Sequence, residues 1–226
     1  MKKIAPRIFL IHATPLAVAP VTQAFERLWP TARLANLLDD TLTADLAAAG
    51  NLNDAITERM LTLARYARGA GADGLLFTCS SFGAAIEAAA AVLDVPTLKP
   101  NEAMYEEALA MCRAFATPAR AGLLTTFAQA SAPMEAEFIE MARLGGAIVP
   151  LDCACAQGAM TLLQNGDATG HDAAIAAAAG RLPEVAVLML GQFSMARALP
   201  TVQGATGKPV LTSPESAVRK LQRVLS

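Results

Sequence analysis

The two halves of this chain match one another. A shift of 113 residues, half of the 226-residue length, superposes them without a gap. The matching segments occur in the same order: Leu10-Ile11 falls on Leu123-Leu124, Leu38-Asp39 on Leu151-Asp152, Leu75-Leu76 on Leu188-Met189, Ser81 on Ser194, and Pro96-Thr97-Leu98 on Pro209-Val210-Leu211. This order predicts a duplicated fold with two lobes, residues 1–113 and 114–226. A closing helix at about 214–225 would be free to pack back on the first lobe.

Short apolar segments alternate with longer helical patterns along the whole chain, which is typical of a parallel sheet covered by helices. We expect strands near Ile8–Ala13, Arg33–Leu38, Gly74–Thr78, Pro96–Leu98, Ala121–Thr125, Ala147–Leu151, Val185–Leu190 and Pro209–Leu211. Four strands fall in each half. The sequence therefore predicts an α/β fold of two flavodoxin-like lobes, each a four-stranded parallel sheet flanked by helices. A pseudo-twofold axis would relate the lobes and place a cleft between them.

Composition excludes several classes of protein. Hydrophobic residues make up 54% of the chain and charged residues 17%, which excludes a disordered protein. The formal net charge of −2 offers no basic face, so we expect neither nucleic acid nor a membrane as a partner. The four cysteines are too few for a disulfide scaffold, and no export signal is recognised, so we expect reduced thiols in the cytoplasm. The apolar surplus favours a homo-oligomer.

Candidate site residues follow the predicted strands, because ligands of open parallel sheets bind beyond the carboxyl ends of the strands. In pairs that are 113 positions apart, these residues are His12-Ala13-Thr14 with Thr125-Thr126-Phe127, Asp39 with Asp152, and Cys79-Ser80-Ser81 with Gln192-Phe193-Ser194.

Cys79 has the most reactive side chain of this set. It follows the apolar strand and precedes Ser80 and Ser81, where a helix is expected to begin. Free N–H groups and the helix dipole at such a position lower the pKa of a thiol. The alternative is a buried and inert cysteine, the usual state of this residue type.

The segment Phe77-Thr78-Cys79-Ser80-Ser81-Phe82-Gly83 resembles the first catalytic motif of the aspartate/glutamate/hydantoin racemase superfamily. Leu190-Gly191-Gln192-Phe193-Ser194-Met195-Ala196 resembles the second motif, and Lys208-Pro209-Val210-Leu211 with Glu215 resembles the last strand and closing helix. The resemblance implies an enzyme that needs no cofactor. It also implies two cysteines that remove and return the proton at the α-carbon of the substrate from opposite faces.

Cys79 matches the first of those two cysteines, but Gln192 stands at the second position. Glutamine has no titratable proton and cannot serve as a general acid or base. Its amide can instead form a hydrogen bond to a carboxylate or a carbonyl group. The same superfamily includes maleate isomerases and the arylmalonate decarboxylases, which resemble a racemase with one cysteine. Those decarboxylases keep the cysteine of the other half, so this chain mirrors them.

Hydroxyl groups surround the predicted site and could bind an acidic substrate through Thr14, Ser80, Ser81, Thr125, Thr126 and Ser194. Fixed donors of this kind stabilise the enolate-like charge that forms at the α-carbon. Hydrogen bonding at strand ends and helix caps is the alternative role of each hydroxyl.

Other polar residues have simpler expected roles. His12 is a possible second acid or base, although a structural histidine at a strand end is favoured. We expect His171 on the surface at a helix start, Cys112 in the core, and structural roles for Asp39, Asp40 and Asp152. Cys153 and Cys155 do not have the spacing of a metal finger, so no metal site is predicted.

Together these features favour a racemase or related isomerase that acts on a small carboxylic acid or amino-acid-like substrate, with Cys79 as proton donor and acceptor. A decarboxylase or lyase that uses the single thiol remains open. So do a binding protein without activity and an enzyme that uses Cys79 as a covalent nucleophile.

Overall fold

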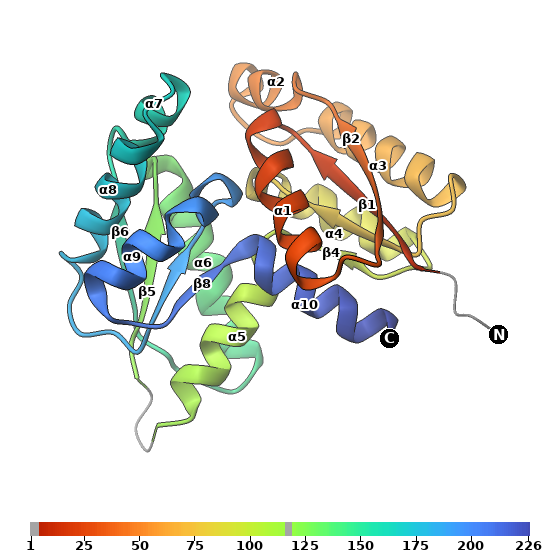
Figure 1. The fold of residues 1–226 in the computed structure, drawn as a ribbon. Helices are drawn as coiled ribbons and strands as arrows, with labels where there is room; N and C mark the ends of the chain where they lie inside the picture. The colour runs from red at the N-terminus through yellow and green to blue at the C-terminus, as the bar shows by residue number, and fades with distance from the viewer. Residues whose placement is uncertain (1–4, 116–118) are drawn as a thin grey trace. The chain divides into compact units, whose positions relative to one another are not determined.

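Two compact units make up the computed structural model of this chain, which describes residues 5–115 and 119–226 (Figure 1). The first unit contains residues up to Ala103 together with Ala217–Ser226, and the second contains Met104–Ser216. The chain passes between the units in the first turns of helices α5 (Glu102–Arg113) and α10 (Ser213–Leu225). Within the described residues, no helix is long and apolar enough to cross a membrane.

The first unit is built on a parallel sheet with the strand order β2-β1-β3-β4. Its strands are β1 (Arg7–His12), β2 (Arg33–Leu38), β3 (Gly74–Phe77) and β4 (Thr97–Leu98). Its helices are α1 (Val18–Leu28), α2 (Leu42–Ala49), α3 (Asp54–Gly69) and α4 (Gly83–Val92), with the short 3-10 helices η1 (Pro15–Ala17) and η2 (Ser80–Phe82).

The second unit repeats this arrangement with the strand order β6-β5-β7-β8, again parallel. Its strands are β5 (Ala121–Thr125), β6 (Leu151–Cys155), β7 (Val187–Leu190) and β8 (Val210–Thr212). Its helices are α6 (Ala128–Leu144), α7 (Ala159–Gln164), α8 (Ala168–Ala179) and α9 (Leu199–Thr206), with the 3-10 helix η3 (Phe193–Ala198). The predicted α/β architecture of two similar four-stranded parallel lobes is confirmed.

The 113-residue repeat is visible in the hydrogen bonds of the sheets. Leu10 pairs with Leu76 in the first sheet, and Leu123 pairs with Met189 in the second. Beyond the last paired residues, the Thr78 N–H donates to the carbonyl of Ile11 over 3.0 Å. The Gly191 N–H donates to the carbonyl of Leu124 over the same distance. The positions that follow, 79 and 192, are therefore equivalent in the two units.

The repeat changes its offset at the second strand of each sheet. Leu38 pairs with His12, whereas Cys155 pairs with Thr125, so the equivalent of Leu38 is Cys155 and not Leu151. The strand predicted at Ala147–Leu151 is wrong, because β6 begins at Leu151. Pro150 has no N–H for a ladder hydrogen bond, and only its carbonyl is used, as an acceptor from Ala121 N–H.

Apolar side chains of β1 and β3 pack against α3 and α4 in the first unit, as Phe9 and Leu75 do with Ile56 and Ile86. Gly74 allows a close approach on the other face of the sheet. A Cβ atom at this position would lie 3.1 Å from the Leu225 side chain and 3.3 Å from that of Leu221, both on α10. The C-terminal part of α10 therefore completes the core of the first unit.

Candidate active site

Cys79 lies two residues beyond the end of β3, a strand whose four residues are all buried. Its backbone is extended, with φ −128° and ψ 121°, and η2 begins at the next residue. The side chain is half-buried and packs against the core formed with α3 and α4. β3 therefore delivers one thiol to the carboxyl edge of the first sheet.

Burial raises the pKa of the Cys79 thiol above its ordinary value. The backbone N–H and the hydroxyl of Ser81 oppose this change by donating hydrogen bonds to the sulfur. The prediction that the start of a helix lowers this pKa is wrong. The helix that follows directly, η2, has only three residues, and the loss of water around the sulfur is a larger influence on this pKa than the two hydrogen bonds from Ser81. The thiol is therefore protonated at neutral pH and suited to donating a proton.

His12 ends β1 and is fully buried. Its Nδ1 lies 2.9 Å from Thr78 Oγ1, and its Nε2 lies 2.9 Å from Asn36 Oδ1. Burial lowers the pKa of His12, although the hydrogen bond with Asn36 opposes this change, and the ring is therefore neutral. Because Asn36 Oδ1 only accepts, Nε2 carries the proton and Nδ1 accepts the proton of the Thr78 hydroxyl. The sequence offered one signal for this network, a polar Asn36 inside an apolar strand.

Gln192 occupies the equivalent position beyond β7, with a similar backbone conformation of φ −129° and ψ 144°. The N–H and the hydroxyl of Thr126 both donate to Gln192 Oε1, each over 2.7 Å. A backbone N–H can only donate, so these bonds determine which end of the amide is oxygen. The Gln192 amide nitrogen has no hydrogen-bond partner among the described residues, which leaves its two N–H groups available to an anion.

The remaining predicted hydroxyls differ in their surroundings. Thr14 caps η1, where its hydroxyl oxygen accepts from Leu16 N–H over 3.4 Å. Thr125 is fully buried, and its hydroxyl lies 2.8 Å from that of Ser131 on α6. Ser80 is half-buried, Ser81 is exposed, and Ser194 is buried in η3. The first unit thus holds Thr14, Ser80 and Ser81 at the edge that carries Cys79, and the second holds Thr125, Thr126 and Ser194 near Gln192.

Asp39 and Asp152 are not equivalent, contrary to the predicted pairing. Asp39 follows β2, where it accepts from the Thr41 hydroxyl and pairs with Arg59. Asp152 lies at the start of β6, at the opposite edge of its sheet, and pairs with Arg120 over 2.6 Å. The changed offset of β6 is the reason for this difference.

His171 is fully buried, so the prediction of a surface position is wrong. Its Nδ1 lies 2.8 Å from Asp172 Oδ1, and Asp172 also accepts from Arg197 Nε over 2.9 Å. The ion pair between Asp172 and Arg197 joins the beginning of α8 to η3. His171 is buried beside this ion pair and contacts the same Asp172 carboxylate.

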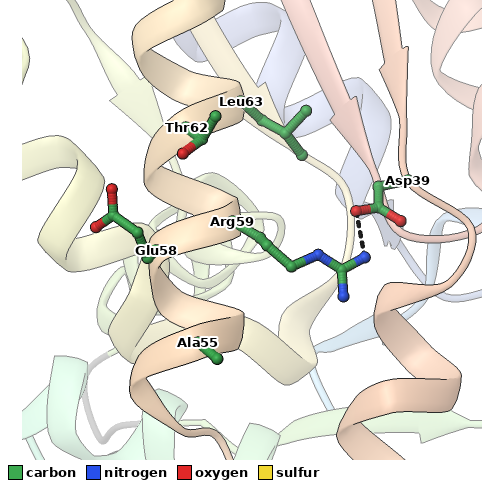
Figure 2. Close-up of a pocket in the computed structure, with 6 residues that line it drawn as sticks. All are labelled: Asp39, Ala55, Glu58, Arg59, Thr62 and Leu63. Atoms are coloured by element: carbon green, nitrogen blue, oxygen red, sulfur yellow. Dashed lines mark hydrogen bonds and ion pairs between the residues drawn. The ribbon is translucent and has the colours of Figure 1, made fainter.

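The structure also contains a surface pocket that the sequence did not predict. Its volume is about 410 Å³, and its walls are formed by Asp39, Ala55, Glu58, Arg59, Thr62 and Leu63. Figure 2 shows the Arg59 side chain reaching from α3 to Asp39 along one side of this pocket. Arg59 also pairs with Asp45, and none of the six lining residues is a cysteine or a histidine. The pocket therefore offers no counterpart to the chemistry of Cys79.

Three further cysteines lie in the second unit. Cys112 is fully buried as predicted. Burial, with the nearby Glu135 carboxylate, raises the pKa of Cys153 to about 11. Cys155 is the half-buried last residue of β6 and pairs with Thr125. Among the described residues, no group of three or more His, Cys, Asp or Glu side chains could hold a metal ion.

Comparisons with known proteins agree with this architecture. The family model described as Asp/Glu/Hydantoin racemase matches residues 15–221. A glutamate racemase from Bacillus anthracis superposes with a TM-score of 0.72 at 12% identity, covering 99% of this chain and 82% of that one. An allantoin racemase from Klebsiella pneumoniae gives 0.72 at 14% identity, with coverages of 98% and 88%. The aspartate racemase of Picrophilus torridus gives 0.71 at 14% identity, with coverages of 98% and 94%.

At these identities, the likeness to solved structures shows the fold alone. A comparison with curated protein sequences finds no match.

Proposed function

Because this chain belongs to the Asp/Glu/hydantoin racemase family, we propose that it is a cofactor-independent racemase or related isomerase. Its substrate is a small carboxylic acid or an amino-acid-like molecule, and the reaction takes place at the α-carbon. Cys79 is the proton donor and acceptor. The partner of the protein is then a small carboxylate, and the compartment is the cytoplasm, where thiols stay reduced.

The observation that carries this proposal is the setting of Cys79 at the carboxyl end of β3. A half-buried thiol with a raised pKa holds its proton at neutral pH, and Ser81 offers two hydrogen bonds to the thiolate that forms when the proton leaves. To accept an α-proton, Cys79 first releases its own proton to water, and the two hydrogen bonds from Ser81 stabilise the resulting thiolate. The thiolate then takes the α-proton. Inversion is completed when water gives a proton to the opposite face of the carbanion, because Gln192 cannot act as an acid.

Gln192 binds an oxygen atom of the substrate in this proposal. The N–H and hydroxyl of Thr126 both donate to the Gln192 amide oxygen, so the two amide N–H groups remain as donors for the substrate. Donors fixed in this way stabilise the negative charge that collects on the carboxylate oxygens as the α-proton departs. Further donors come from the hydroxyls of Thr14, Ser80 and Ser194. Thr126 and Ser81 instead use their own N–H and hydroxyl groups to hold Gln192 and the Cys79 sulfur, and Thr125 supports Thr126 from within the core.

The first test measures deuterium incorporation at the α-carbon in D2O by NMR. Both enantiomers of glutamate, aspartate and allantoin serve as probes, since structures of racemases for these compounds share the fold. Cys79→Ala should reduce exchange by at least about 100-fold, because a general acid–base group contributes at least this much. Cys155→Ala is the matched control and should keep the exchange rate. Full exchange in Cys79→Ala would contradict the proposal, and tight binding without exchange would indicate a binding protein.

A decarboxylase is the second candidate, and the glutamine at position 192 favours it. With one thiol, a proton reaches the α-carbon from one face only. The bond to a carboxylate breaks, its electron pair stays on the α-carbon as an enolate, and the Cys79 proton is transferred there. A disubstituted malonic acid tests this candidate. Release of CO₂ with a single product enantiomer would support it, and racemic product would contradict it.

A further inference from the structure

His12 and Thr78 lie side by side at the carboxyl edge of the first sheet. Leu10 pairs with Leu76, so His12 and Thr78 are the next opposed residues on β1 and after β3. The Thr78 N–H donates to the carbonyl of Ile11 over 3.0 Å and so holds Thr78 to β1. The Thr78 hydroxyl has one proton, which it donates to Nδ1 of His12 at 2.9 Å rather than to the more distant Ile11 carbonyl oxygen at 3.3 Å.

The ring of His12 is itself fixed from the other side. Asn36 on β2 accepts from Nε2, so one chain of hydrogen bonds, Asn36–His12–Thr78, crosses three neighbouring strands. Both ring nitrogens are engaged, His12 is fully buried, and Thr78 is 5% exposed. Two hydrogen bonds fix the plane of an imidazole ring, so Thr78 has a rigid partner.

Thr78 is the residue before Cys79, and their side chains leave the chain on opposite faces. Phe77 and Cys79 pack toward α3 and α4, whereas Thr78 faces His12. The hydrogen-bond chain therefore fixes the backbone that carries the thiol without covering the sulfur. The equivalent residue in the second unit is held differently. Gly191, the residue before Gln192, has no side chain that could form such a contact. Thr126 instead donates two hydrogen bonds directly to the side-chain amide oxygen of Gln192.

We propose that His12 is a positioning residue that acts on Cys79 through Thr78 and holds the thiol in its half-buried place beside Ser81. The catalytic part of this inference rests on the proposed function of Cys79, but the positioning itself does not.

Alkylation by iodoacetamide, followed by mass spectrometry of each cysteine, tests the positioning without any substrate. Thr78→Val keeps the shape of the side chain and removes the hydroxyl. We expect Cys79 to react at least about threefold faster in this variant, because a released thiol spends more time exposed to solvent. The apparent pKa of Cys79 alkylation should also decrease toward its ordinary value, since burial is what raises it. Cys112 is fully buried and reports global loosening, so its rate should not change.

Two controls complete the design. Thr78→Ser keeps the hydroxyl and should react like the wild type. Thr212→Val makes the same change at the end of β8, where the buried Thr212 hydroxyl has no hydrogen-bond partner among the described residues, and Cys79 should again react like the wild type. If Thr78→Val does not fold, Asn36→Ala repeats the test at an exposed position of β2 and should speed Cys79 labelling about twofold.

Turnover provides the second measurement. If Cys79 is catalytic, Thr78→Val should lower kcat about tenfold or more with little change in KM, because small misplacement of a reacting group is costly. An unchanged or slower Cys79 alkylation rate in Thr78→Val would overturn the positioning role, as would an equal rise at Cys112. Wild-type protein without turnover, but with the expected labelling pattern, would overturn only the proposed function.

Discussion

At the scale of single residues, Cys79 and Gln192 share one backbone position and differ in how they are held. Cys79 is fixed through the residue before it, which leaves the sulfur free to change its protonation state. Gln192 is fixed through its own side chain, which leaves only its N–H groups free. The first arrangement suits proton transfer and the second suits recognition of an oxygen atom. Equivalent positions in the two units therefore hold side chains of different chemistry, which the proposed function uses for proton transfer and for substrate binding.

Gln192→Ala should weaken catalysis without abolishing it. A hydrogen bond to a charged group contributes about 1.5–3 kcal/mol, so kcat/KM should decrease roughly tenfold to hundredfold. Initial rates of deuterium exchange on the best probe measure this change. Gln192→Glu is the informative companion, because its second carboxylate oxygen replaces the N–H donors and repels an anionic substrate. Equal rates in the wild type and Gln192→Glu would contradict the assigned role.

The candidate residues at strand ends could be predicted from the sequence, but their partners could not. Cys79 and Gln192 follow apolar strands and fall 113 positions apart, so pattern alone marks them. The hydrogen bonds between Thr126 and the Gln192 amide depend on the side-chain rotamers of two residues that follow neighbouring strands. The direction of the Cys79 pKa shift likewise depends on how much water the sulfur loses, a quantity that no sequence pattern contains.

At the scale of elements, long apolar patterns were predicted well and short or interrupted ones were not. α2 and α7 have only eight and six residues, which are too few turns for a helical period to be recognised in the sequence. α6 begins at Ala128 and contains Pro133, although proline is more typical of the first turn of a helix. The strand at β6 was misplaced because Ile148 and Val149 look like strand residues, although Ile148 is 88% exposed.

Gly191, which follows β7, has little room for a side chain. A Cβ atom there would contact the Met134 methyl group and would lie 3.0 Å from the carbonyl oxygen of Leu124. Gly191→Ala should therefore lower the free energy of unfolding by about 1–3 kcal/mol, the usual cost of overpacking. Urea denaturation measures this change.

Gly204→Ala is the matched control for Gly191→Ala. A Cβ at Gly204, inside α9, would meet no atom within 4 Å, so this variant should be more stable than the wild type by about 0.5–1 kcal/mol. A Gly191→Ala variant as stable as the wild type would show that Met134 can move aside.

At the scale of the whole molecule, the duplication explains both what is shared and what differs between the units. Three of four strands keep the 113-residue offset, as the pairs Leu75 with Thr97 and Leu188 with Val210 illustrate. The second strand does not, since α6 has 17 residues where α1 has 11. The fold could therefore be predicted because burial of apolar strands tolerates such insertions. The local register could not, because a few extra helical residues leave the pattern of the strands unchanged.

Acidification should destabilise the whole molecule through His12. Burial disfavours the charged ring, so the folded chain holds the His12 pKa below its ordinary value of 6.5, although the hydrogen bond with Asn36 opposes this. The unfolded chain then binds more protons than the folded chain between those two pKa values. The free energy of unfolding therefore decreases as the pH falls below 6.5 toward the folded pKa, and the full contribution is present above 6.5. Urea denaturation at several pH values from 7.5 to 5, compared between the wild type and His12→Gln, measures this slope. His12→Gln should be less stable than the wild type at every pH, but its free energy of unfolding should depend less steeply on pH. Equal slopes in the two proteins would mean that burial does not keep the His12 ring neutral.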